Sequence, residues 1–216
     1  EPLLLSKVGN LAAAKALVSK GWARIEELRV ERDPHEGDEF IASEPLELMG
    51  QQEIALNAIL ESMAKPERPP LLLHGVTGSG KTEVYLQATA KALNQGQTVI
   101  VLVPEISLTP QTVERFKSRF SEKQNEIAVL HSHLSQGERF DEWHKIHRNE
   151  ARIVIGARSA IFAPLENLGL IIVDEEHESS YKQESNPRYH GRDIAVLRSR
   201  IEGCAIVLGS ATPSLE

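Results

Sequence analysis

One glycine-rich turn constrains the fold of this chain more than any other feature. The apolar run Leu71–His74 leads into Gly-Val-Thr-Gly-Ser-Gly-Lys-Thr, and a helix-like stretch follows. The pattern G-x-x-x-x-G-K-[ST] between a strand and a helix is typical of a loop that cradles phosphates. Its glycines let successive backbone N–H groups point at phosphate oxygens, and the following helix adds its positive N-terminal end. The predicted nucleotide-binding residues are Gly75, Val76, Thr77, Gly78, Ser79, Gly80, Lys81 and Thr82.

The last two residues of this loop have chemistry of their own. Lys81 supplies a mobile positive charge for the β- and γ-phosphates, and the hydroxyl of Thr82 is placed to bind Mg²⁺. ATP and Mg²⁺ are therefore the predicted ligands of the loop.

The pattern around the loop predicts an α/β fold. Apolar runs rich in β-forming residues alternate with helical stretches, which predicts a parallel sheet covered by helices on both faces. Thr109-Pro110 and the capping box that begins at Ser135 mark two helix starts. The predicted strands are residues 71–74, 98–103, 127–131, 152–156, 170–174 and 205–209, and the two longest predicted helices are residues 48–63 and 80–94.

Residues 1–45 differ from the rest and are predicted to form a separate segment, with the main domain at 46–216. Asn10–Lys20 is rich in Ala and Leu and predicts a helix that Gly21 ends. Ala23–Val30 alternates loosely like a strand, and Asp33–Glu44 is an acidic stretch typical of an exposed linker. A helix followed by a strand fits the second half of a winged-helix module, but it also fits any small α+β fragment.

Composition excludes several classes of protein. The net charge of −7 argues against a protein that binds nucleic acid by bulk charge alone, although a local basic groove stays possible. The single cysteine, Cys204, rules out an intrachain disulfide. We see no run long enough to span a membrane and no signal peptide, so we expect no membrane partner and a cytoplasmic location. The first residue is Glu1 rather than Met, which suggests a processed or excised chain.

A second acidic motif follows an apolar run. Residues 170–173 lead into Asp174-Glu175-Glu176-His177. A carboxylate at the end of a buried strand can bind Mg²⁺, and the next one is placed to orient or deprotonate an attacking water. We assign Asp174 to Mg²⁺ and Glu175 to the water, and with Lys81 they form the predicted catalytic set. His177 completes that set as a link between the nucleotide and another site, or it is a structural histidine.

Between this motif and the C-terminal strand, aromatic and basic residues alternate. Aromatic faces stack on unpaired bases, while Lys and Arg neutralise phosphates. Pro187 and Gly191 favour a loop here. The alternative is a surface loop whose tyrosines pack on the domain. The candidate DNA contacts in this segment are Tyr181, Lys182, Arg188, Tyr189 and His190.

The sequence resembles a known family at several motifs. Asp174-Glu-Glu-His, with Gly209-Ser-Ala-Thr212 further on, resembles motifs II and III of superfamily 2 helicases. Residues 75–85, 103–109, 156–164 and 174–183 narrow the resemblance to bacterial replication-restart helicases, over about residues 46–216. The resemblance implies a RecA-like lobe that uses ATP and Mg²⁺ to move 3′ to 5′ on single-stranded DNA. It also implies forked DNA, primosome proteins and single-strand-binding protein as partners in the bacterial cytoplasm.

The resemblance also assigns individual residues. It makes Gln52, or else Gln51, the residue that recognises adenine upstream of the phosphate loop. It implies a winged-helix origin for residues 1–45. It makes DNA-side groups of Pro104, Glu105, Thr109, Arg158 and Ser159, and coupling residues of Ser210 and Thr212. The segment from Tyr181 to His190 likewise resembles the aromatic-rich loop that couples DNA to ATP in this family.

The resemblance finally implies a second RecA-like lobe with an arginine finger, and a zinc region, outside these residues. We therefore expect the isolated chain to bind nucleotide weakly, to hydrolyse ATP slowly and not to unwind DNA, because an arginine finger is worth about 10³–10⁵ in rate. The alternatives are another superfamily 2 translocase of the fork-reversal or restriction type, a phosphate-loop kinase or switch, and a DNA-binding scaffold that does not use nucleotide.

Overall fold

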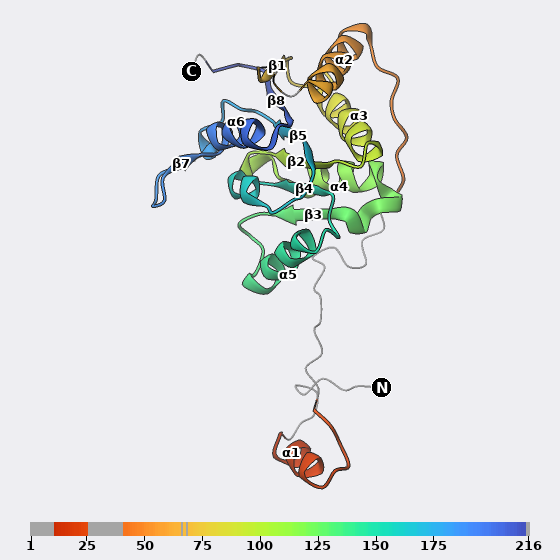
Figure 1. Ribbon diagram of the computed structural model, residues 1–216, viewed down its shortest axis with the longest axis vertical. Coiled ribbons are helices and arrows are strands. Elements are labelled where there is room, and N and C mark those ends of the chain that lie inside the picture. Colours follow the sequence, from red (N-terminus) through yellow and green to blue (C-terminus); the bar gives the residue numbers. More distant parts are fainter. Residues whose placement is uncertain (1–10, 26–40, 66, 68, 215–216) are drawn as a thin grey trace. The chain divides into compact units, whose positions relative to one another are not determined.

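A six-stranded parallel sheet forms the centre of the larger of two compact units, residues Arg32–Glu216, and the smaller unit is Glu1–Glu31. The computed structural model describes residues 11–25, 41–65, 67 and 69–214 (Figure 1). The strand order is β1-β8-β5-β2-β4-β3. The strands are β1 (Leu71–His74), β2 (Thr98–Leu102), β3 (Ile127–Leu130), β4 (Ile153–Gly156), β5 (Leu168–Val173) and β8 (Ala205–Ser210).

The predicted coverage of both sheet faces is confirmed by the way single strands divide their side chains. In β2, Val99 and Val101 pack into one hydrophobic cluster, while Ile100 and Leu102 pack into a second one. Both faces are thus removed from water, which is why the strands are continuous apolar runs. Helices α2 (Gly50–Ala64), α3 (Lys81–Asn94) and α4 (Pro110–Arg119) contribute to the first cluster, and α5 (Gln136–His147) and α6 (Gly191–Glu202) to the second.

The predicted helix starts are confirmed by their capping contacts. The Thr109 hydroxyl accepts the Thr112 N–H at 3.3 Å before α4. Ser135 and Glu138 form a reciprocal capping box before α5. The helix predicted over residues 48–63 is shifted slightly and begins at Gly50.

The segment after residue 180 differs from the predicted loop. It forms a small antiparallel hairpin, β6 (Lys182–Gln183) with β7 (Tyr189–His190), and α6 begins directly at Gly191. Gly191 lies close to Arg158, since an added Cβ would meet Arg158 Cγ at 3.0 Å. This glycine therefore permits close packing at a helix start rather than a loop.

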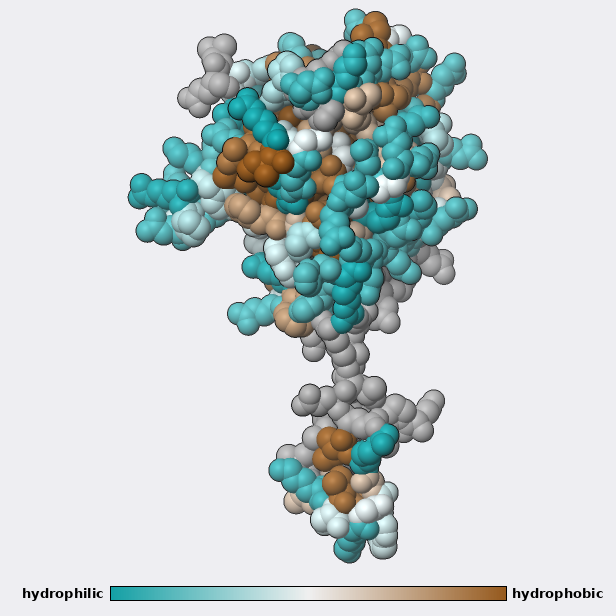
Figure 2. Space-filling model, in the orientation of Figure 1, coloured by the Kyte–Doolittle hydropathy of each residue, from teal (hydrophilic) through white to brown (hydrophobic). Residues whose placement is uncertain are grey.

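Helix α6 is apolar on more than its buried side. Ala195 is fully buried toward the sheet, yet Leu197 and Ile201 are 52% and 74% exposed. Figure 2 shows a hydrophobic patch in this region, surrounded by hydrophilic side chains.

The smaller unit contains the expected helix, α1 (Leu11–Ser19), with Gly21 in the left-handed region at φ 73° just after it. Of the predicted strand, residues 23–25 have no regular structure and residues 26–30 lie outside the described residues. The winged-helix origin of this unit stays a prediction.

Of the expected linker, residues 33–40 lie outside the described residues, and residues 41–44 belong to the larger unit, as does Leu46. The Leu46 N–H donates to Glu83 Oε1 at 3.1 Å, and the Ser43 N–H donates to the Ser118 carbonyl at 3.0 Å. The division at Glu31 therefore lies earlier than the predicted boundary at residue 45.

Among the described residues, no helix combines the length and the apolar character needed to cross a membrane.

Candidate functional site

The phosphate loop follows β1 at the edge where the strands of the parallel sheet end. Gly78 and Gly80 have φ of 80° and 84°, a left-handed conformation that favours glycine. At Gly75 an added Cβ would lie 2.6 Å from Ser79 Oγ, so the loop also needs a glycine there for close packing. Helix α3 begins immediately at Lys81, which directs its N–H groups toward the loop.

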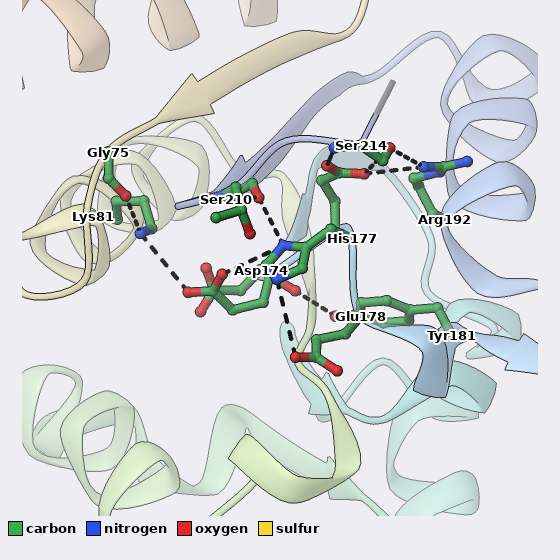
Figure 3. A network of polar contacts seen from close by, with 12 residues as sticks. Gly75, Lys81, Asp174, His177, Glu178, Tyr181, Arg192, Ser210 and Ser214 are labelled. Carbon is green, nitrogen blue, oxygen red and sulfur yellow. Dashed lines mark hydrogen bonds and ion pairs between the residues drawn. The ribbon is translucent and has the colours of Figure 1, made fainter. Parts of the chain in front are cut away.

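Lys81 lies within this loop rather than in solvent. Its ammonium donates to the Gly75 carbonyl at 2.6 Å and lies 3.8 Å from Glu175 Oε1 (Figure 3). The Lys81 side chain is 9% exposed. The lysine charge is therefore held between the loop and the acidic motif, which come from separate parts of the chain.

Gln52 contacts the phosphate loop from α2. Its amide donates to the Ser79 carbonyl at 2.9 Å and accepts the Met49 N–H at 2.8 Å. An added Cβ at Gly80 would lie 2.3 Å from its amide nitrogen. Gln51, by contrast, is exposed. The geometry favours Gln52 over Gln51, and the recognition of adenine stays a prediction.

The acidic motif begins where β5 ends. The Asp174 N–H donates to the Leu102 carbonyl at 2.9 Å, and the carboxylate accepts the Tyr85 hydroxyl at 3.0 Å. Burial raises the pKa of the Asp174 carboxyl above its usual value, and the Glu175 charge adds to the rise, although Tyr85 and Lys81 oppose it. A nearby cation would favour the charged form of this carboxyl.

Glu175 adopts a backbone conformation that is uncommon for its residue type. Its φ is 45°, in the left-handed region, where a side chain with a Cβ is strained. Strain of this kind gathers at functional sites. The side chain lies between Lys81 and His177, 3.8 Å from each.

His177 joins the acidic motif to the end of β8. Its Nδ1 lies 2.7 Å from Ser210 Oγ, and Ser210 Oγ also accepts the Thr212 N–H at 3.1 Å. These contacts place His177, Ser210 and Thr212 in one hydrogen-bonded group beside Glu175. The geometry therefore favours a link between the nucleotide site and another site over a purely structural role for His177.

No role was predicted for Glu176, yet it is the most buried acid of the motif at 3% exposure. Its carboxylate accepts Arg192 Nη1 at 3.0 Å, the Ser214 N–H at 2.9 Å and the Ser214 hydroxyl at 3.1 Å. Burial alone would raise the pKa of Glu176, but these hydrogen bonds and the Arg192 charge lower it. Glu176 therefore ties the acidic motif to α6 and to the segment after β8.

A cleft of about 810 Å³ brings the two motifs together. Lys81, Thr82, Asp174 and Glu175 line the same cavity, so the predicted phosphate loop and acidic strand end do face each other. Sequence reasoning missed the opposite wall. It consists of residues 41–43, Leu46 and the α4 side chains Gln111, Glu114, Arg115, Ser118 and Arg119.

The residues at this cleft fit a nucleotide with Mg²⁺. The glycine turn lines the cleft, and the Thr82 hydroxyl and the Asp174 carboxylate are oxygen ligands of the kind that Mg²⁺ prefers. The size of the cleft also suits a ligand of this class.

The comparisons with known proteins agree with this site. Residues 50–216 match the family model described as DEAD/DEAH box helicase. The chain belongs to the DEAD/DEAH box helicase family. Use of ATP and Mg²⁺ by this domain follows from that membership.

Two curated relatives of this helicase domain carry the name Replication restart protein PriA. The protein from Bacillus subtilis (strain 168) is 56% identical over 205 residues, which are 95% of this chain and 25% of the relative. The one from Synechocystis sp. is 50% identical over 211 residues, 96% of this chain and 24% of the relative. The chain thus spans about a quarter of the length of these relatives, and the homology implies DNA binding.

Solved helicase structures share the fold. RecG bound to a three-way DNA junction matches with a TM-score of 0.59 and 27% identity, over 78% of this chain and 21% of that one. The UvsW helicase from bacteriophage T4 matches with a TM-score of 0.55 and 15% identity, over 80% and 55%. The expected RecA-like lobe is therefore confirmed.

For a helicase domain, the segment proposed to contact DNA needs one correction. Tyr181 is fully buried in the second hydrophobic cluster, and its hydroxyl donates to the Asp174 carbonyl at 2.7 Å. The prediction that Tyr181 stacks on a base is wrong, because no base can reach its ring. Its contact with Asp174 fits the coupling role instead.

Tyr189 is half-buried and has aromatic and basic neighbours. Its ring packs edge-on against Phe162 with centroids 5.2 Å apart, and the Arg158 guanidinium lies 5.7 Å from its centroid. Phe162 is 49% exposed and had no role assigned from the sequence. Lys182 and Arg188 are exposed beside them, and His190 is half-buried.

Besides its position near the Tyr189 ring, Arg158 also has a structural function. It donates to the carbonyls of Ser180 and Lys182 at 3.1 Å and 2.7 Å, which holds the start of the hairpin. Ser159 is exposed next to it. Contact of these two residues with DNA stays a prediction.

The three DNA-side candidates after β2 differ in accessibility. Pro104 is buried and caps the short 3₁₀ turn Glu105–Ser107. The prediction that its side chain contacts DNA directly is therefore wrong. Glu105 accepts the N–H and the hydroxyl of Ser132. Burial would raise the pKa of Glu105, yet these hydrogen bonds lower it. Thr109 is exposed, although its hydroxyl caps α4.

Proposed function

We propose that this chain is the ATP-binding lobe of a 3′ to 5′ DNA helicase that acts in replication restart at stalled forks. One observation carries the proposal: the phosphate loop and the acidic strand end share a cleft, with Lys81 Nζ 3.8 Å from Glu175 Oε1. The name of the relatives supports the pathway. Forked DNA, primosome proteins and single-strand-binding protein are the proposed partners, in the bacterial cytoplasm.

In the proposed reaction, Lys81 neutralises charge on the β- and γ-phosphates. Thr82 and Asp174 would hold Mg²⁺, which supplies further charge neutralisation at the phosphates when bound. Glu175 orients the water that attacks the γ-phosphorus and takes its proton, while the bond to the bridging oxygen breaks to give ADP and phosphate. His177 is hydrogen-bonded to Ser210, so a change in the bound nucleotide can alter the conformation of the segment after β8 through this pair.

The test is nucleotide binding followed by hydrolysis in the 216-residue chain. We expect Mg²⁺-dependent binding of ATP and slow turnover, because the proposed motor needs an arginine finger from a second lobe. Turnover equal to that of an intact two-lobed helicase would contradict the two-lobed proposal. Absence of nucleotide binding would contradict the proposal as a whole and favour the scaffold.

Glu175→Gln should reduce single-turnover hydrolysis of bound ATP by at least about 100-fold, because loss of a positioned general base costs about 10²–10⁴ in rate. With radiolabelled ATP and excess protein, the rate of a single turnover can be measured even if the chain hydrolyses ATP slowly. ATP binding is measured in the same variant, so that lost turnover is not confused with lost substrate. Glu178→Gln, three residues on and part-exposed, is the control. Normal hydrolysis in Glu175→Gln would show that its role is wrongly assigned.

The hairpin and the adjacent aromatic pair are the proposed DNA contact. Tyr189→Ala should weaken binding of single-stranded oligonucleotide by about 5- to 100-fold, because base stacking is worth about 1–3 kcal/mol per base. Fluorescence anisotropy with a labelled oligonucleotide measures the effect, and ATP binding is not expected to change. Phe140→Ala removes another exposed aromatic side chain, from α5, and is the control. Equal DNA affinity in both variants would assign Tyr189 to packing.

A translocase that processes junctions is the second candidate, favoured by the 27% identity to RecG. The higher identity to the replication restart proteins favours the replication-restart helicase proposed above. Unwinding compared with branch regression on fork substrates separates the two in a protein that contains this lobe.

A further inference from the structure

Tyr85 is a buried polar side chain behind the acidic motif, and the proposed reaction does not use it. It lies on α3, one turn after the phosphate loop, and is 2% exposed. Its hydroxyl donates to Asp174 Oδ1 at 3.0 Å. An ionised carboxylate only accepts hydrogen bonds, so the direction of this bond is fixed.

Gly209 provides the space that this hydroxyl occupies. An added Cβ at Gly209 would lie 1.7 Å from the Tyr85 hydroxyl oxygen and 3.2 Å from Asp174 Oδ1. No side chain fits there without displacing the hydroxyl. The Gly209 carbonyl in turn accepts the Glu176 N–H at 2.9 Å. The contact between Tyr85 and Asp174 thus depends on the bare backbone of β8.

The three residues come from three motifs. Tyr85 is on the helix of the phosphate loop, Asp174 ends β5 and Gly209 is in β8. Among the described residues that line the cleft, Asp174 is present and Tyr85 is not. Asp174 is thus the cleft residue to which the Tyr85 hydroxyl is hydrogen-bonded.

We propose that Tyr85 is a positioning residue that holds the Asp174 carboxylate in place to bind the Mg²⁺ of the nucleotide. This inference rests on the proposed function. Hydrogen bonds to a metal-ligating carboxylate fix its orientation, and their loss costs about 10- to 100-fold in metal affinity. A purely structural role, in which the ring fills the core, requires only the ring.

Tyr85→Phe separates these roles because it keeps the ring and removes the hydroxyl. The probe is a fluorescent ATP analogue, titrated with Mg²⁺ in the 216-residue chain. We expect the Mg²⁺ concentration at half-maximal binding to rise about 10-fold, with the affinity measured in EDTA changing far less. Thermal unfolding without nucleotide reports whether the variant is folded.

Gly209→Ala is the second variant, because its methyl group displaces the Tyr85 hydroxyl without a substitution at position 85. It should raise the Mg²⁺ midpoint in the same direction. Tyr181→Phe is the comparison, since this hydroxyl binds the backbone carbonyl of Asp174 rather than its carboxylate. We expect it to move the midpoint less.

An unchanged Mg²⁺ midpoint in folded Tyr85→Phe overturns the inference, and so does an equal shift in Tyr181→Phe, which would indicate general loosening around Asp174. Failure of the proposed function gives a different result. In that case the parent chain itself shows no Mg²⁺-dependent nucleotide binding.

Discussion

Lys81→Ala is expected to weaken binding of Mg²⁺–ATP to this chain by roughly 10- to 100-fold. A hydrogen bond to a charged group contributes about 1.5–3 kcal/mol, and no other described lysine lines the cleft. Anisotropy of a fluorescent ATP analogue measures the loss. The variant also frees the Gly75 carbonyl from its 2.6 Å contact, so the fold is checked by thermal unfolding.

Lys91→Ala is the matched control, because Lys91 is an exposed lysine on the same helix α3. It should bind the analogue like the parent chain. If Lys81→Ala and Lys91→Ala bound the analogue with equal affinity, the assignment of the phosphate loop to the nucleotide site would be contradicted.

Arg119→Met is expected to lower the free energy of unfolding by about 3–5 kcal/mol. Arg119 forms a two-point contact with Glu83, at 2.9 Å and 2.7 Å, and both side chains are at most 10% exposed. Removing Arg119 leaves the buried Glu83 charge without its cationic partner. Urea unfolding followed by circular dichroism measures the change.

The pH dependence has a definite sign. Burial would raise the pKa of Glu83, but hydrogen bonds from Arg119, Gln87 and the Leu46 N–H, with the Arg119 charge, lower it below the usual 4.5. The pair therefore stabilises the fold above pH 4.5, and this contribution is lost as pH falls through the lower folded pKa. The gap between parent and Arg119→Met should narrow in acid.

Arg115→Met on the same helix is the control, since Arg115 is exposed. Its free energy of unfolding should stay within about 0.5 kcal/mol of the parent. The double variant Glu83→Gln with Arg119→Met should recover part of the loss, because it no longer buries a charge. An Arg119→Met chain as stable as Arg115→Met would show that the ion pair is energetically neutral.

The parts of the site that could be predicted from the sequence are those formed by consecutive residues. The phosphate loop and Asp174-Glu175 each require a local backbone turn next to a strand, so their spacing along the chain already describes their geometry. The six strands were predictable for a similar reason, because burial on both faces makes each of them a continuous apolar run.

What sequence could not predict depends on packing between distant segments. Tyr181 has the composition of a stacking residue, but its burial is set by the second hydrophobic cluster. The contacts of Tyr85 with Asp174 and of Glu176 with Arg192 join separate motifs, and no periodicity marks them. Helix α6 was missed because Gly191 favoured a loop, whereas here it allows the helix to begin against Arg158.

The hairpin is fastened at both of its ends to the acidic motif. Before it, the Tyr181 hydroxyl binds the Asp174 carbonyl, and after it, Arg192 binds the Glu176 carboxylate. The chain between these anchors, residues 182–191, leaves the acidic motif and returns to it. The length and sequence of the hairpin tip can therefore change without altering the spacing between Asp174 and Glu175.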